Sequence, residues 1–585
     1  MLKLLRYMRV KEWLLILCSV VFIVAQVFLD LKLPDYMSEI TRLVQTQGSK
    51  MSEILTAGGY MLLCALGSIT SSIIVAGFAA RVASNFSKWL RELQFNKVES
   101  FSMEEINGFS TASLITRSTN DITQVQMFIA MGLQLIIKAP ITAVWAITKI
   151  EGKGGDWTAA TAGAVIVLIV MITVVIAFAV PRFRKIQGFT DNINRVTREN
   201  LTGIRVVRAY NAENYQENKF DVANSELTQN NLTANRIMAI IMPTMSMIMS
   251  GLSLAIYWIG AYLINSAGMP DKITLFSNMV VFMSYAIQVV MSFMMLSMIF
   301  IMLPRASVAA KRIAEVIGTK PTILDGKVTS SPAGAVGEVE FRNVSFKYPD
   351  ASEYVLEDVS FTAHKGETVA FIGSTGSGKS TLINLVPRFY DTTEGEVLID
   401  GVNVKDYTQE ALHDKFGYVP QRAVMFSGTV ESNVAFGDNG KGAYTEEDIR
   451  NSIEIAQSLD FVENMPGQLK GNIAQGGTNL SGGQKQRLSI ARAVCRKPEI
   501  YIFDDSFSAL DYKTDKVLRS ALKEKTADTT SLIVAQRIGT IKNADKIVVL
   551  EEGRVVGMGT HKELMKNCEV YQEIALSQLS KEELA

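Results

Sequence analysis

The sequence predicts a membrane-spanning α-helical domain that is fused to a cytosolic α/β domain with a phosphate-binding loop. Three observations carry this prediction. Long apolar segments fill the first half of the chain. In the second half, strand-like runs alternate with helical patterns. A GxxxxGK[ST] motif lies between one such strand and the helix that follows it.

Composition narrows the class of protein further. The 585 residues are enough for two or three domains, and 58 basic side chains balance 58 acidic ones, so charge gives no reason to expect a nucleic acid partner. The four cysteines lie far apart without a CxxC pair, which disfavours a zinc site and a disulfide scaffold. All three histidines lie in the second half, which excludes a histidine proton relay in the membrane.

Six segments are long and apolar enough to cross a bilayer, which takes about 20 residues. They are 13–33, 55–80, 126–150, 157–180, 237–264 and 273–303. Basic residues precede the first span and no small-residue cleavage site follows it, so we expect a retained span. The connections after spans two and four are long and rich in Arg and Lys, which places them, the N-terminus and the segment Arg305–Arg312 in the cytoplasm.

Two features inside the spans have open interpretations. Charge is scarce there, and Lys138 is the exception. It either lines a functional cavity, or snorkels to the interface or pairs with an acid. Methionines crowd spans five and six, where flexible thioethers suit a broad hydrophobic cavity or simply fill gaps against lipid.

The phosphate loop follows the strand Thr368–Ile372 directly and opens a helix. It consists of Gly373, Ser374, Thr375, Gly376, Ser377, Gly378, Lys379, Ser380 and Thr381. Glycines let backbone N–H groups surround phosphate oxygens, Lys379 reaches the terminal phosphates, and Ser380 can bind Mg²⁺. A second apolar strand ends at Asp504, where a carboxylate supports the magnesium ion.

Together with the signature Leu480-Ser-Gly-Gly-Gln484, these residues resemble those of an ABC transporter of the exporter type (type IV), with six spans fused to one nucleotide-binding domain. Tyr348 is similar to the family's adenine-stacking aromatic, Gln421 to its Gln-loop, and Ser508–Asp511 to its D-loop. Thr202–Glu213 resembles the second cytoplasmic loop of bacterial multidrug exporters. The resemblance implies coupling helices near Ser113–Asp121 and Ala209–Gln216.

The resemblance also implies a set of site residues and the cofactors ATP and Mg²⁺. ATP contacts are expected from Tyr348, the phosphate loop, Ser481, Gly482, Gly483, Gln484 and Asp511. Mg²⁺ is expected at Ser380, Gln421 and Asp504, and catalytic roles at Asp505, Gln536 and Gln421.

Two positions depart from the family pattern on the hydrolytic side of the site. Asp505 stands where the family usually has Glu, and Gln536 where it usually has His. The missing methylene withdraws the carboxylate by about 1.5 Å, and a misplacement of that order costs about a hundredfold in rate. Gln536 can donate a hydrogen bond but carries no charge. Gln475 is a lesser change, since related exporters often have Glu there.

These departures resemble the degenerate half of a heterodimeric bacterial multidrug exporter. In the family, two nucleotide domains close head to tail on two ATP molecules, so a second half-transporter is required. We expect this chain's own site to hydrolyse ATP slowly and its LSGGQ to complete a competent site on the partner. The expected cargo is hydrophobic or amphipathic, with drugs foremost. The alternatives are a homodimeric exporter of lipids or peptides and an ATP-gated membrane regulator.

The expected organisation has four parts. They are a transmembrane domain at 1–317, a linker at 318–338 that is rich in Pro, Ser and Gly, a nucleotide-binding domain at 339–578, and a polar tail at 579–585. The expected location is the bacterial cytoplasmic membrane.

Overall fold

A computed structural model describes residues 2–46, 48–151, 154–332, 336–349, 351–440 and 442–578. The expected polar tail and linker residues 333–335 lie outside the described residues. The chain forms two compact units, Met1–Glu99 with Thr111–Thr319, and Ser100–Ser110 with Lys320–Ala585.

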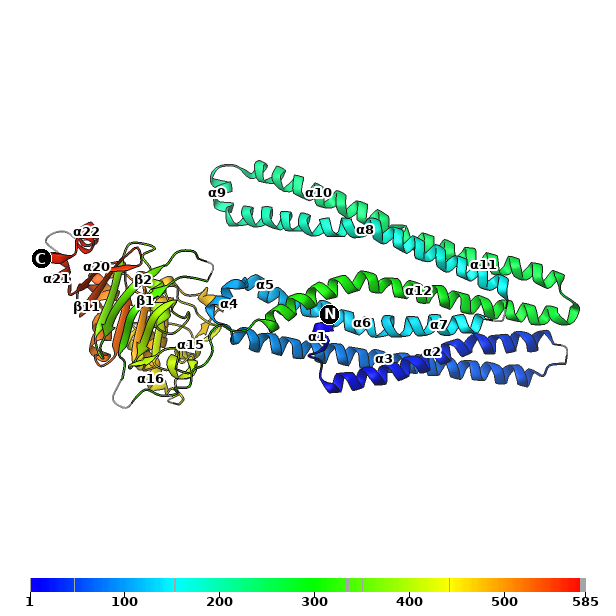
Figure 1. Cartoon of the computed structure of the whole chain (residues 1–585), viewed down its shortest axis with the longest axis horizontal. Helices are drawn as coiled ribbons and strands as arrows, with labels where there is room; N and C mark the ends of the chain where they lie inside the picture. Colours follow the sequence, from blue (N-terminus) through cyan, green and yellow to red (C-terminus); the bar gives the residue numbers. More distant parts are fainter. Residues whose placement is uncertain are drawn as a thin grey trace. The chain divides into compact units, whose positions relative to one another are not determined.

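The regular secondary structure of the first unit is all helical in its described residues (Figure 1). Its elements are α1 (Leu2–Leu5), α2 (Val10–Gln45), α3 (Met51–Glu99), α5 (Thr111–Thr116), the π-helix η1 (Arg117–Asp121), α6 (Ile122–Leu133), the π-helix η2 (Gln134–Lys138), α7 (Ala139–Ile150), α8 (Gly155–Thr202), α9 (Ile204–Ala209), α10 (Glu213–Ala239), α11 (Ile241–Ser266) and α12 (Met269–Gly318).

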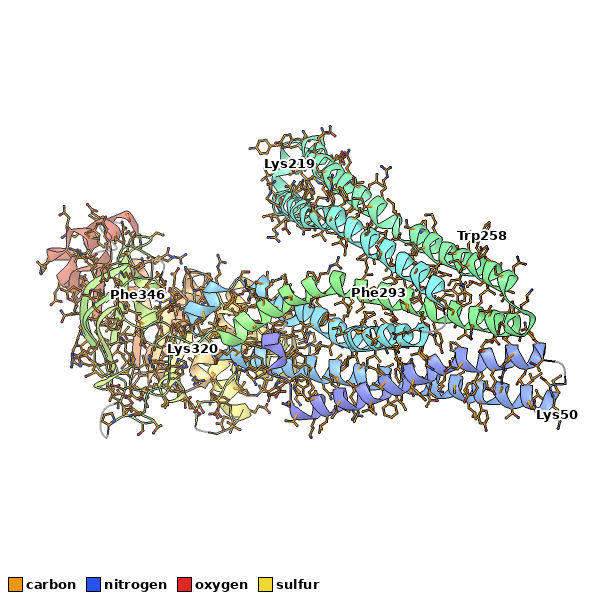
Figure 2. All side chains as sticks on the ribbon, turned by 45° about the vertical axis from the view of Figure 1, so that its right-hand side comes forward. Lys50, Lys219, Trp258, Phe293, Lys320 and Phe346 are labelled. Carbon is orange, nitrogen blue, oxygen red and sulfur yellow. The ribbon has the colours of Figure 1, made fainter. Side chains whose placement is uncertain are left out.

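Six helical stretches in the described residues are long and apolar enough to cross a membrane, and each contains one predicted span. At about 1.5 Å per residue, the 48 residues of α8 extend over about 72 Å, more than twice the roughly 30 Å of bilayer hydrocarbon. On α11, Leu254, Trp258 and Tyr262 recur every four residues and are exposed, with Trp258 projecting from the helix (Figure 2). The chain is therefore a multi-pass membrane protein with an apolar surface suited to lipid.

Two ion pairs join charged side chains of the membrane helices. Lys138 Nζ lies 3.2 Å from Asp30 Oδ2, and Lys149 Nζ lies 2.7 Å from Asp35 Oδ2. Tyr285, which is fully buried, donates its hydroxyl to Asp35 Oδ1 at 2.6 Å. The interpretation of Lys138 as the exceptional charge was wrong, because Asp30 and Lys149 also lie within predicted spans. Lys138 was expected either to line a functional cavity, or to snorkel or pair with an acid. In the structure it pairs with an acid.

The methionines of spans five and six divide between core and surface. Met245 and Met279 are buried in the core of the helical unit, beside Trp157 and Phe282. Met242, in contrast, is 75% exposed. The methionine pattern thus reflects packing in part, and some of the methionines face outward from this chain.

The second unit is built on a six-stranded sheet in the order β12-β11-β3-β10-β9-β6, with a four-stranded sheet β2-β1-β4-β5 and a small pair β7-β8. The strands are β1 (Val339–Phe346), β2 (Leu356–Ala363), β3 (Thr368–Gly373), β4 (Glu394–Ile399), β5 (Val402–Asn403), β6 (Phe416–Val419), β7 (Gly428–Thr429), β8 (Asn472–Ile473), β9 (Ile500–Asp504), β10 (Thr530–Val534), β11 (Lys546–Glu551) and β12 (Arg554–Gly559).

Helices flank these sheets (Figure 1). They are α4 (Met103–Gly108), α13 (Lys379–Leu385), α14 (Gln409–His413), α15 (Val430–Val434), α16 (Glu446–Ile455), α17 (Leu459–Glu463), α18 (Gly482–Cys495), α19 (Tyr512–Lys525), α20 (Ile538–Ile541), α21 (His561–Asn567) and α22 (Glu569–Gln578). Strands β11, β3, β10, β9 and β6 run parallel. Because β9 is buried along its whole length, its continuous apolar run is that of a central parallel strand. The predicted fold class is confirmed.

The segment expected to be a linker is bound to the nucleotide-binding unit. Val328 forms a parallel bridge with Tyr407, and Ser331 Oγ donates to Asp400 Oδ2 at 2.7 Å. Asp400 also pairs with the buried Lys415 at 2.8 Å. The described part of 320–338 is therefore packed against that unit as part of it, although its Pro, Ser and Gly content is typical of a flexible linker.

Candidate nucleotide-binding site

The phosphate loop has the backbone that phosphate binding requires. It joins the carboxyl end of β3 to the start of α13, and Gly376 and Gly378 have φ of 87° and 93°. A Cβ at Gly378 would come within 2.9 Å of Val355 O, so only glycine fits there. The loop therefore presents its N–H groups together at a helix N-terminus, where they suit an anion.

Lys379 is folded into this loop. Its Nζ donates to Gly373 O at 2.9 Å, to Ser374 O at 2.7 Å and to Ser377 Oγ at 3.2 Å. Burial lowers the pKa of Lys379, while Asp505 and Asp504 act in the opposite direction. All three ammonium donors are thus held by loop oxygens that triphosphate oxygens can replace.

Ser380 and Asp504 meet at the expected magnesium position. Ser380 Oγ donates to Asp504 Oδ1 at 2.9 Å, across the junction of α13 and β9. Burial raises the pKa of Asp504, and the Ser380 hydrogen bond opposes that rise. A hydroxyl and a carboxylate oxygen side by side fit a hard cation such as Mg²⁺, which would neutralise the buried acid and offset the charge of nucleotide phosphates.

Asp505, Gln536 and Gln421 form one hydrogen-bonded cluster at the carboxyl ends of β9, β10 and β6. Gln536 Nε2 donates to Asp505 Oδ2 at 2.9 Å, and Gln421 Nε2 donates to the same oxygen at 3.4 Å. Asp505 adopts a left-handed backbone with φ of 45°, and its N–H donates to Val534 O at 3.0 Å. Burial raises its pKa. In this arrangement the Gln421 amide nitrogen is engaged with Asp505.

Tyr348 lies beside the end of the phosphate loop. Its hydroxyl shares a hydrogen bond with Thr381 Oγ1 at 3.1 Å. The structure thus brings together the phosphate loop, Asp504, the Asp505 cluster and the aromatic expected to stack on adenine.

The signature residues belong to a different part of the same unit. Ser481 caps α18 and forms a capping box with Gln484, whose Oε1 accepts from Ser481 N at 2.8 Å. Asp511 caps α19 by accepting from Thr514 N at 3.0 Å, and this bond holds the pKa of Asp511 low. Helix α18 packs in one core and α13 in another. In the described part of the chain, no recorded hydrogen bond joins Ser481, Gly482, Gly483 or Gln484 to the phosphate loop.

Sequence reasoning missed Gln578, which holds the switch segment. Its Nε2 donates to Gln536 O at 2.7 Å, and its Oε1 accepts from Ile538 N at 2.9 Å. Gln578 ends α22 and fixes the backbone on both sides of Arg537. No local pattern marks it, because its partners lie about forty residues earlier in the chain.

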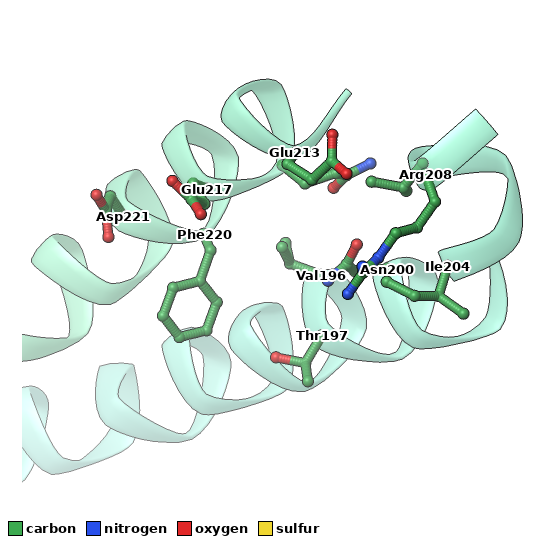
Figure 3. A pocket seen from close by; sticks show the side chains of 11 residues that line it. Val196, Thr197, Asn200, Ile204, Arg208, Glu213, Glu217, Phe220 and Asp221 are labelled. Carbon is green, nitrogen blue, oxygen red and sulfur yellow. The ribbon is translucent and has the colours of Figure 1, made fainter. Parts of the chain in front are cut away.

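The segment that resembles the second cytoplasmic loop lies at the tip of α8 and α10. A cavity of about 410 Å³ lies inside the tip (Figure 3). Its lining includes Val196, Thr197, Asn200, Ile204, Arg208, Glu213, Glu217, Phe220 and Asp221. Beside it, Tyr210 is 80% exposed and Tyr215 67% exposed, so the predicted segment Ala209–Gln216 presents aromatic rings to its surroundings.

Known proteins match both halves of the chain. Residues 15–314 match the ABC transporter transmembrane region, and residues 356–508 match the ABC transporter family. An uncharacterized ABC transporter ATP-binding protein of Mycobacterium tuberculosis is 38% identical over 526 residues, which are 90% of this chain and 88% of that protein. An ATP-dependent lipid A-core flippase of Pseudomonas fluorescens is 31% identical over 492 residues, covering 83% of this chain and 80% of that protein.

A solved structure has the same fold. A bacterial Atm1-family ABC exporter with ATP bound superposes with a TM-score of 0.77 over 97% of this chain and 98% of that chain, at 24% identity. Fold, family matches and site geometry agree, and the chain is a membrane-spanning member of the ABC transporter family with an exporter fold and a C-terminal ATP-binding domain.

Proposed function

We propose that the chain is one half of a heterodimeric ATP-driven exporter of hydrophobic or amphipathic compounds, and that its own ATP site is the slow one. The observation that supports this most directly is the Asp505 cluster. The acid at the hydrolytic position is one methylene short and is held by two uncharged amides, from Gln536 and Gln421. A carboxylate that is one methylene short, with an uncharged amide in place of the histidine at the switch position, is poorly placed to activate water.

The requirement for a second chain rests on the separation of the two half-sites. The phosphate loop lies at α13, whereas Ser481 and Gln484 begin α18 in a different core. An exposed helix start suits the terminal phosphate of a nucleotide held by another subunit. Because LSGGQ is intact here, this chain completes a competent site on its partner.

The residues of this chain divide the work. Lys379 and the loop N–H groups bind the triphosphate, Ser380 and Asp504 hold Mg²⁺, and Tyr348 stacks on the base. Closure of the two nucleotide domains moves the cytoplasmic loops, and the membrane helices reopen on the other side. The exposed Tyr210 and Tyr215 provide an aromatic surface by which the second loop docks on the partner.

The cargo we propose is a drug-like amphiphile. The methionines of spans five and six suit ligands of varied shape. A lipid is the second candidate, because a relative with 31% identity is an ATP-dependent lipid A-core flippase. A pure ATP-gated regulator is disfavoured, since such a protein has no use for an intact signature.

The test is to purify the chain alone and together with the half-transporter encoded beside it, and to measure substrate-stimulated ATPase in vesicles. We expect activity from the pair, little change from Asp505→Ala, and loss on replacing the partner's corresponding acid. Brisk ATPase from the chain alone, abolished by Asp505→Ala, would show a homodimer that uses Asp505 as its base. ATP binding without transport by the pair would favour the regulator.

A further inference from the structure

The connection between the second and third spans contains a short helix that is anchored in the nucleotide-binding unit. Segment Ser100–Ser110 joins α3 to α5 and belongs to that unit, ahead of the expected position Ser113–Asp121, which lies in the other unit. Within it, Glu105 Oε2 accepts from Ser102 N at 2.7 Å and Glu105 Oε1 from Thr322 N at 2.9 Å. Burial opposes ionisation of Glu105, but these hydrogen bonds outweigh it and lower its pKa. An ionised carboxylate therefore holds α4.

The exposed end of α4 reaches a cluster of aromatic rings. Asn107 Nδ2 donates to the hydroxyl of Tyr390 at 2.8 Å. The Tyr390 ring meets the Tyr348 ring edge to face, with centroids 5.3 Å apart and planes at 90°. Phe346, at the end of β1, contacts both rings. Its ring centroid lies 5.0 Å from that of Tyr348 and 5.6 Å from that of Tyr390. Tyr348 is thus held from two sides.

The hydroxyl end of Tyr348 is also held, by its hydrogen bond to Thr381 of the phosphate loop. A ring that stacks on a nucleobase gains affinity when its orientation is set before the base arrives, because less side-chain freedom is lost on binding. Edge-to-face contacts between aromatic rings set such an orientation. Tyr390 makes this contact, and Asn107 holds Tyr390.

We propose that Tyr390 and Asn107 are positioning residues for the nucleobase, so that α4 sets the affinity of this site for adenine through the orientation of Tyr348. The proposal rests on the proposed function, in which Tyr348 stacks on ATP. Because binding free energies are reciprocal, a bound base stabilises the seat of α4 by the same factor. When the base leaves its pocket, the attachment of α4 to the nucleotide-binding unit should therefore become weaker.

The test separates the base from the phosphates. Full-length protein is titrated calorimetrically at low temperature with ATP and with ribose 5′-triphosphate, which lacks the base. Tyr348→Ala is expected to weaken ATP binding about 5- to 150-fold, as loss of one base–aromatic stack does. It should leave the affinity for ribose 5′-triphosphate unchanged. Tyr390→Phe keeps the ring and removes only the hydroxyl that Asn107 binds. It should weaken ATP binding about three- to tenfold, the range for loss of one hydrogen bond, again without changing the affinity for ribose 5′-triphosphate.

Two further variants make the result specific. Asn107→Ala removes the same hydrogen bond from its other end, so Asn107→Ala with Tyr390→Phe should weaken ATP no more than either change alone. Tyr354→Phe is the matched control, because it removes another tyrosine hydroxyl, which donates to Glu394 at 2.8 Å. It should leave both affinities unchanged. In ATPase assays, Tyr390→Phe should raise KM for ATP with little change in kcat.

The outcomes separate this proposal from the one it rests on. One outcome is that Tyr348→Ala weakens the binding of ATP but not of ribose 5′-triphosphate, while the affinities of Tyr390→Phe and Asn107→Ala stay within twofold of wild type. The positioning role is then refuted and the stacking role stands. If Tyr390→Phe weakens both ligands equally, its role is general packing and the proposal fails. If Tyr348→Ala does not distinguish the two ligands, the assignment of Tyr348 to adenine fails as well.

Discussion

Placing the family's usual glutamate and histidine in this chain should accelerate ATP hydrolysis at its own site. The change is Asp505→Glu together with Gln536→His. In the structure, Asp505 Oδ2 accepts from Gln536 Nε2, beyond the end of β10, at 2.9 Å and from Gln421 Nε2, beyond the end of β6, at 3.4 Å. A glutamate carboxylate extends about 1.5 Å further, which is one carbon–carbon bond.

The magnitude follows from that length. A misplacement of about 1 Å costs about a hundredfold in rate, and general-base catalysis contributes at least that much, so we expect a gain of about 10- to 100-fold in hydrolysis at this site. This corresponds to about 1.4–2.7 kcal/mol of transition-state stabilisation. The left-handed backbone at residue 505, with φ of 45°, suits Asp better than Glu. The same variant should therefore lose up to about 1 kcal/mol of stability.

The assay is ATP turnover by the purified transporter in vesicles. Lys379→Ala, added to the double variant, removes the ammonium that binds the terminal phosphates of this site and should abolish the whole gain. A gain below threefold would refute the view that the two substitutions limit this site. A gain that survives Lys379→Ala would show that the added activity arises elsewhere.

Two further predictions concern stability. Asp30→Asn leaves Lys138 without its acid in the membrane and should destabilise the protein by about 2–3 kcal/mol, whereas Asp30→Asn with Lys138→Met should recover most of that loss, as measured by thermal unfolding in detergent. Asp400→Asn removes one of two acids from the buried Lys415, which keeps Glu499, and should destabilise the nucleotide-binding unit by about 3 kcal/mol. Burial raises the pKa of Asp400, but hydrogen bonds led by that from Lys415 outweigh it and lower the pKa below its usual 3.8. The contribution of Asp400 is therefore complete above that value and is lost as pH falls through the lowered pKa, so Asp400→Asn should flatten acid unfolding in this range.

Features with a local signal were predictable from the sequence. The six spans follow from hydropathy alone, and the loop from Gly373 to Thr381 from glycines between a strand and a helix. Asp504 follows from the end of a buried strand. Each depends on neighbours within a few residues, so the pattern and the structure coincide.

Features that depend on distant partners were not predictable. Asp30 and Lys138 are 108 residues apart, and nothing in either segment marks the pairing. Asn107 meets Tyr390 across 283 residues. The segment near 320–338 has the composition of a free linker, yet backbone hydrogen bonds to Asp406 and Tyr407 hold it. Composition reports which backbone shapes are allowed, and tertiary contacts decide which one forms.

Asp505 and Gln536 are best understood as one unit. Both are one change away from the family pattern, and the hydrogen bond between them ties the position of each to the other. In Asp505→Glu alone, the longer side chain must either bend to keep its hydrogen bond to the amide of Gln536 or leave the buried carboxylate without that donor, and both outcomes offset the gain. We therefore expect each single change to gain less than threefold, and the pair to gain more than the product of the two. Strict additivity would mean that the acid and the switch residue act on hydrolysis separately, despite their shared hydrogen bond.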